Sequence, residues 1–98
     1  MTINQEKNGE ALMIKLAGRL DTMTAPELEA ELKSCLAGIT KLTFDFSELE
    51  YISSAGLRVL LSTQKTMNKQ GSMVIKAANE NVNEVFEVTG FSDILTLE

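Results

Sequence analysis

Two adjacent serines, Ser53 and Ser54, are the side chains whose position in this sequence most directly suggests chemistry. They follow segment 41–46, where apolar and polar residues alternate as in a half-buried strand, and they precede an apolar stripe with helical spacing. A serine at the start of a helix can accept hydrogen bonds from free backbone N–H groups, and the same helix end favours an added anion. Capping accounts for one serine. The other serine needs a different explanation. Because the small residues Ala55 and Gly56 follow, we expect its hydroxyl to be accessible to another protein.

The residue types that most enzymes need are missing. The sequence has no histidine, and its single cysteine, Cys35, can build neither a zinc thiolate site nor an internal disulfide. It also lacks a Gly-x-x-x-x-Gly-Lys-Ser/Thr phosphate loop. Glu48 and Glu50 alternate along a short connection, where we expect them to face water rather than to form a catalytic pair. We therefore expect no enzymatic activity, no metal and no cofactor.

The length and charge of the chain narrow the possible classes of function further. Ninety-eight residues, 44% of them hydrophobic and 23% charged, predict one globular domain over residues 1–98. A net charge of −5 argues against nucleic-acid binding, which needs clustered Lys and Arg. Because no apolar stretch is long enough to span a bilayer and the amino-terminal residues are unlike a signal peptide, we expect no membrane association. With Cys35 expected to be a reduced core residue, these features indicate a cytoplasmic protein.

Turn and cap residues divide the chain into strands and helices. Asn8-Gly9 is a strong hairpin signal between predicted strands 2–7 and 11–17, and a loop is expected over residues 18–23. The first helix is predicted to have Thr24 as its N-cap, Glu27 as the capping-box partner and Gly38 as a left-handed C-cap. The other expected elements are a strand at 41–46, a helix from the serines to near Gly71, a strand at 72–78, a helix capped by residues 81–84 and closed by Gly90, and a short strand or ordered tail at 94–97.

This β-β-α-β-α-β-α-β pattern predicts an α/β fold with a mixed, mostly parallel sheet and crossover helices. The loop at 18–24 and the turn at 53–56 both leave carboxyl ends of strands, so we expect them to share one rim. Asp21 and Ser54 would then be neighbours, with Cα atoms closer than about 15 Å. The alternative is that Asp21 only caps the turn at 22–25.

Three motifs resemble a known family. Segment 45–57, Asp-Phe-Ser-Glu-Leu-Glu-Tyr-Ile-Ser-Ser-Ala-Gly-Leu, resembles the STAS-domain signature of bacterial anti-sigma factor antagonists. Segment 17–21, Ala-Gly-Arg-Leu-Asp, is similar to the family's earlier Gly-x-Leu/Ile-Asp motif, and segment 86–94 is similar to its carboxyl-terminal Phe-x-x-x-Gly element. The three motifs occur in the family's order, and the resemblance covers essentially the whole chain. It implies a single STAS-type domain.

The resemblance also implies a regulatory switch. Members of this family bind an anti-sigma factor that is also a serine kinase, and so free a sigma factor for transcription. The kinase phosphorylates the turn serine of the antagonist and thereby releases it, and a metal-dependent serine phosphatase restores the binding form. Aligned on Gly56, the phosphorylated serine corresponds to Ser54, with Ser53 as the alternative, and Asp21 corresponds to the family's acid near that serine.

The sequence departs from the family pattern at two positions. Many members have Asp immediately before the phosphorylated serine, where this chain has Ser53, and Ser or Thr before the glycine, where it has Ala55. The first change removes a local orienting carboxylate and adds a rival hydroxyl. Because non-phosphorylated relatives exist, the resemblance implies the fold more firmly than it implies control by a kinase.

The residues assigned to partner contact are Asp21, Met23, Thr24, Ser53, Ser54, Ala55, Gly56 and Arg58. Arg58 opposes the helix dipole, and it could pair with Glu50 or Asp21, contact a partner or remain solvated. One alternative function is a non-phosphorylated STAS module that binds another regulatory protein, such as a transporter, a chemoreceptor or a sensory assembly. Another is a nucleotide binder that uses the same rim.

Overall fold

A computed structural model describes residues 1–98. The elements in chain order are β1 (Thr2–Asn8), β2 (Ala11–Leu20), α1 (Ala25–Cys35), β3 (Lys41–Ile52), α2 (Ser54–Gln70), β4 (Ser72–Lys76), α3 (Glu80–Thr89) and the 3-10 turn η1 (Phe91–Asp93).

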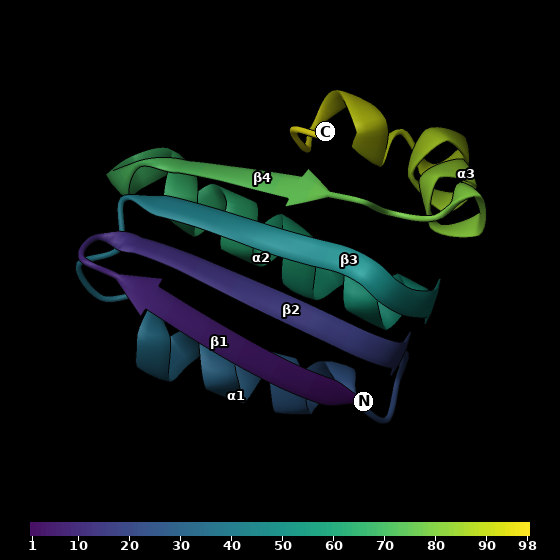
Figure 1. Ribbon diagram of the computed structural model, residues 1–98. Helices are drawn as coiled ribbons and strands as arrows, with labels where there is room; N and C mark the ends of the chain where they lie inside the picture. Colours follow the sequence, from purple (N-terminus) through teal and green to yellow (C-terminus); the bar gives the residue numbers. More distant parts are fainter.

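The four strands form one sheet in the order β1-β2-β3-β4. β1 is antiparallel to β2, whereas β2–β3 and β3–β4 are parallel pairs joined through α1 and α2. Figure 1 shows α1 and α2 on one face of the sheet and α3 beyond the β4 edge. The predicted mixed, mostly parallel sheet is confirmed. The predicted fifth strand is reduced to one parallel bridge between Ile75 and Leu97, so the regular pattern ends at α3 and η1.

Alternating burial explains the central strands. Every second residue of each central strand is buried on the face of the sheet that packs against the core: Leu12, Ile14 and Leu16 of β2, and Leu42, Phe44 and Phe46 of β3. On α2 the core face includes Leu57, Leu60 and Met67, as the helical spacing predicted, whereas Leu61 of the same predicted stripe is only half-buried. The sheet and the two helices thus share one hydrophobic core.

β2 and β3 run further than the sequence pattern predicted. The loop expected from residue 18 begins only after Leu20, and β3 continues six residues past Phe46 to Ile52. Leu20 and Ile52 are register partners and both are buried, so continued pairing shields two large apolar side chains. Gly18 makes this possible: it has φ +96° next to a shift in register, a bulge conformation that favours glycine. Glu48 and Glu50 are therefore strand residues, although they are exposed as predicted.

β4 is shorter than predicted, ending at Lys76 rather than residue 78. Ala77 has φ +62°, a left-handed conformation incompatible with a strand. The chain turns here towards α3, and Ala77 is exposed.

The N-cap of α1 at Thr24 is confirmed, but the Thr24 side chain makes no cap bond, so the capping box with Glu27 is absent. Two other helix boundaries were predicted wrongly. α1 ends at Cys35, and Gly38 has its left-handed conformation (φ +78°) in the turn that follows. α3 begins two residues earlier than expected, because Asn79 is its N-cap and accepts a hydrogen bond from the Val82 N–H. The predicted ends at Gly71 and Gly90 are confirmed.

Candidate functional site

The carboxyl ends of β2 and β3 bring the two predicted site segments together. The Ser53 N–H donates to the Leu20 carbonyl at 2.9 Å, and the residues that follow are Asp21, just after β2, and Ser54, the first residue of α2. Since each neighbouring residue adds one Cα step of about 3.8 Å, the Asp21 and Ser54 Cα atoms lie within about 13 Å of each other. The expectation of a shared rim is confirmed. We call the loop at 21–24 and the turn at 53–56 together the rim.

The two serines occupy different environments. Ser53 is the N-cap residue of α2, with extended backbone (φ −103°, ψ 176°), but its side chain makes no cap bond. Its Oγ is buried and has no hydrogen-bond partner. Ser54 is the first residue of α2 and is exposed. The hydroxyl that another protein can reach is therefore that of Ser54.

Asp21 is fixed by the loop that contains it. Its Oδ1 accepts hydrogen bonds from the Met23 N–H at 3.0 Å and the Thr24 N–H at 3.2 Å. The Asp21 N–H donates to Thr24 Oγ1 at 2.9 Å, and that hydroxyl donates to the Arg19 carbonyl at 2.9 Å. Asp21 therefore does cap this loop, as the structural alternative predicted. Its side chain is still 29% exposed, so the fixed carboxylate remains accessible to solvent.

These contacts keep the Asp21 carboxylate charged. Partial burial raises the pKa of Asp21, but the hydrogen bonds from Thr24 and Met23 and the nearby charge of Arg19 outweigh it, so its pKa is below the ordinary value. The rim therefore carries a fixed negative charge at neutral pH.

The sequence did not point to Arg19 and Tyr51. The Arg19 Nε lies 3.7 Å from Asp21 Oδ2, and its guanidinium carbon lies 4.3 Å from the centre of the Tyr51 ring. The two residues are register partners on β2 and β3. Stacking of this kind holds a cation over an aromatic face. The pairing follows from the extended β3 strand, so a sequence signal would have required the strand boundary that was missed.

The other predicted contact residues differ in exposure. Met23 is 85% exposed. Arg58 is also exposed and forms no ion pair, and together with the half-buried Ala55 it lines a groove of about 330 Å³ between α1 and α2. Gly56 is buried, and a Cβ there would lie 2.7 Å from Leu20 Cγ. Gly56 thus allows α2 to approach β2 closely, and it is covered by Leu20 and Ile52 rather than exposed to a partner.

No helix combines the length and apolar character needed to cross a membrane. No three His, Cys, Asp or Glu side chains are grouped so that they could hold a metal ion.

Comparison with known proteins identifies the family. The family described as "Mlab, STAS domain" matches residues 3–97. A protein of Bordetella bronchiseptica named as a candidate anti-sigma factor antagonist, BtrV, is 38% identical over 96 residues, which cover 96% of this chain and 83% of that protein.

Solved structures share the fold. An anti-sigma factor antagonist from Mycobacterium paratuberculosis superposes with a TM-score of 0.86 at 24% identity, covering 98% of this chain and 83% of that one. The Bacillus protein SpoIIAA, an anti-sigma factor antagonist, superposes in its unphosphorylated form with a TM-score of 0.78 at 18% identity, covering 99% and 87% of the two chains. Its phosphorylated form gives a TM-score of 0.77 at 18% identity, with 99% and 91% covered. Family match, relative and fold agree, and this chain belongs to the STAS-domain family of anti-sigma factor antagonists.

Proposed function

We propose that this protein binds an anti-sigma factor that is also a serine kinase, that binding frees a sigma factor, and that phosphorylation of Ser54 ends the binding. A serine phosphatase would restore the binding form, and the cycle would run in the cytoplasm. The observation that carries the proposal is an exposed Ser54 at the first position of α2, on the same rim as a fixed Asp21 carboxylate. The 38% identity to the Bordetella protein supports an antagonist role.

The domain itself should tolerate a phosphate on Ser54. The first turn of α2 contains no acidic residue, and no side chain caps this end. The N-terminus of a 17-residue helix therefore offers its dipole and N–H groups to an anion, which such an end favours by about 0.3–1 kcal/mol. We expect phosphorylation to leave the backbone of the domain nearly unchanged.

A bound partner would not share that benefit. A phosphoserine adds about −1.5 to −2 charge and three acceptor oxygens, which must be desolvated if an interface closes over them. The fixed Asp21 carboxylate on the same rim adds repulsion between like charges. A loss of a few kcal/mol of binding free energy corresponds to a tens- to hundreds-fold rise in the dissociation constant. Release would follow from local charge and bulk.

Burial favours Ser54 over Ser53 as the modified residue. A kinase must bring its phosphate donor to the attacking hydroxyl, and the Ser53 Oγ is covered by protein. The Ser54 side chain needs no rearrangement to be reached.

The test is to incubate the protein with its anti-sigma kinase and ATP and to locate the phosphate by mass spectrometry. Wild type and Ser53→Ala should both be phosphorylated on residue 54, whereas Ser54→Ala should incorporate no phosphate and still bind the kinase. Phosphate on Ser53, or undiminished incorporation in Ser54→Ala, would contradict the assignment.

A further inference from the structure

The net charge of the protein is confined to its carboxyl-terminal part. Residues 1–76 contain nine acidic and nine basic residues, whereas residues 77–98 contain five acidic and no basic residues. Three of those acids, Glu80, Glu84 and Glu87, are on α3 and are exposed. α3 therefore carries three of the five net negative charges and Asp93 and Glu98 carry the other two, whereas residues 1–76 are neutral overall.

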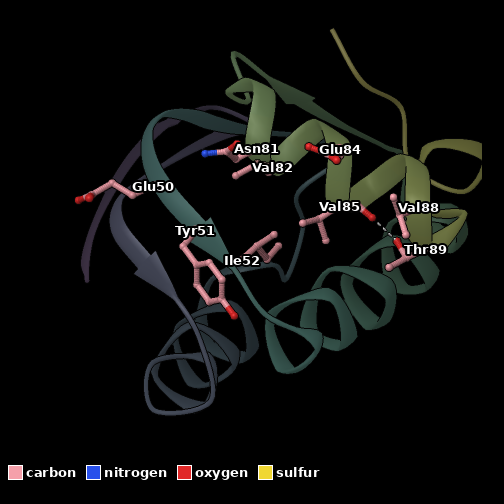
Figure 2. Close-up of a pocket in the computed structure, with 9 residues that line it drawn as sticks. All are labelled: Glu50, Tyr51, Ile52, Asn81, Val82, Glu84, Val85, Val88 and Thr89. Atoms are coloured by element: carbon pink, nitrogen blue, oxygen red, sulfur yellow. Dashed lines mark hydrogen bonds between the residues drawn. The ribbon is translucent and has the colours of Figure 1, made fainter.

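An apolar groove of about 430 Å³ lies between α3 and the end of β3. Figure 2 shows Tyr51 and Ile52 of β3 on one side and Val85 and Val88 of α3 on the other. Val88 is 79% exposed and Tyr51 41% exposed, so this apolar surface is open to water. Exposed apolar surface framed by polar side chains is typical of binding sites for other proteins.

Carboxylates frame the groove. Glu50 and Glu84 are among the residues that line it, and both are exposed. No basic residue lines the groove, and the charge of Arg19, whose guanidinium stacks on Tyr51, is paired with Asp21. The groove therefore combines apolar side chains with two negatively charged ones at its edge.

We propose that this groove binds an amphipathic helix of a partner protein, with apolar side chains against Tyr51, Val85 and Val88 and with Lys or Arg residues facing Glu50 and Glu84. A helix laid in a groove presents its apolar residues three and four positions apart, and basic residues at its edges complement carboxylates. The charge pattern selects this occupant because nucleic acid, acidic peptides and anionic membranes would all be repelled by α3.

The inference is independent of whether Ser54 is phosphorylated. Ile52 and Ser53 are consecutive, so a partner in the groove would lie next to the rim, but its recognition rests on the apolar and acidic side chains of the groove. Its failure would leave the proposed switch untouched, and failure of the switch would leave the groove untouched.

The test uses a synthetic helical peptide of Leu and Lys residues as the probe, with a Leu and Glu peptide of the same apolar pattern as its control. Titration into the isotope-labelled protein should shift the backbone amide NMR signals of 50–52 and 81–89 and leave those of β1 unchanged. Added salt should weaken binding, because the contacts between charges are exposed. The Leu and Glu peptide should not bind.

Two variants of α3 distinguish a direct contact between the probe and the groove from a general effect of the negative charge of the protein. Glu84 lines the groove, whereas Glu87 is exposed on the same helix and does not line it. Glu84→Lys should weaken probe binding about threefold to tenfold, and Glu87→Lys should stay within about twofold of the wild type. Thermal unfolding of both variants should match that of the wild type. Equal effects of the two variants, shifts outside the groove, or equal binding of the Leu and Glu peptide would each overturn the inference.

Discussion

The rim and the groove meet at the end of β3, but different forces hold them. The rim is set by short-range polar contacts, with Asp21 and Thr24 bonding to each other and to neighbours at most five residues away. The groove exists because α3 is fixed to β3 by segments about thirty residues apart. Asn79 Nδ2 donates to the Leu49 carbonyl at 3.0 Å, and Val82 and Phe86 pack into the core. A small domain can thus offer one surface whose geometry is local and another whose geometry depends on tertiary packing.

The largest effect on stability is expected where the rim meets the core. Gly56→Ala should lower the free energy of unfolding by about 1–3 kcal/mol, because the new Cβ would overlap Leu20 Cγ and lies close to Ile52 Cγ1 as well. Urea unfolding measures this. Ser54→Ala, at an exposed position in the same turn, is the control and should stay within about 0.5 kcal/mol of the wild type. Equal stability of Gly56→Ala and wild type would show that α2 does not approach β2 this closely.

A second substitution loosens the groove without touching the rim. Asn79→Ala removes the N-cap of α3 and its bond to Leu49, and should cost about 1–2 kcal/mol. Hydrogen exchange should become faster for the amides of α3 and remain unchanged for the loop at 21–24. Asn81→Ala, an exposed groove position, is the control. If α1 and α3 loosened together, the two regions would not be separable.

The charge of Asp21 gives the rim a pH signature. Its pKa is depressed in the folded protein, so the stability that it contributes is fully present above its unfolded pKa of about 3.9 and is lost as pH falls through the folded value. Asp21→Asn keeps an acceptor oxygen but lacks the charge. The wild type should be more stable than this variant at neutral pH, and the difference should vanish in strong acid. A difference that does not change with pH would assign the effect to packing.

The smallest effect on the free energy of unfolding is expected at Ser53. Ser53→Ala should change the free energy of unfolding by less than about 0.5 kcal/mol or stabilise slightly, because its buried hydroxyl has no hydrogen-bond partner to lose. Denaturant unfolding of the variant measures this. A loss above about 1 kcal/mol would reveal a bond made by that hydroxyl, and the contrast between the two serines would need revision.

Periodicity predicted the elements better than their ends. The buried faces of β2, β3 and α2 follow from spacing alone, and so does the shared rim, since parallel strands end on one side of a sheet. The extension of β3 to Ile52 was missed because the run Ser47-Glu48 interrupts the alternation, and only pairing with β2 compensates for it. The positive φ of Ala77 likewise could not be predicted, because alanine does not favour a left-handed conformation.

The site shows the same division. Ser54, Asp21 and Met23 could be singled out because their positions follow from the strand ends and the motifs. Arg19, Tyr51 and the groove could not, since their contacts depend on register and on where α3 packs. The sequence pattern predicted the cap of α3 at residues 81–84, whereas the N-cap is Asn79. With the start of α3 predicted two residues late, its contribution to one side of the groove could not be predicted.

The measurement that tests the central claim most directly is the affinity of the anti-sigma kinase for this protein before and after stoichiometric phosphorylation of Ser54. The unmodified protein should bind tens- to hundreds-fold more tightly than the phosphorylated one. The two forms should have nearly the same backbone amide spectrum outside the rim. Equal affinity of the two forms, or a loss of affinity accompanied by rearrangement of the whole domain, would contradict a switch that acts through local charge at the start of α2.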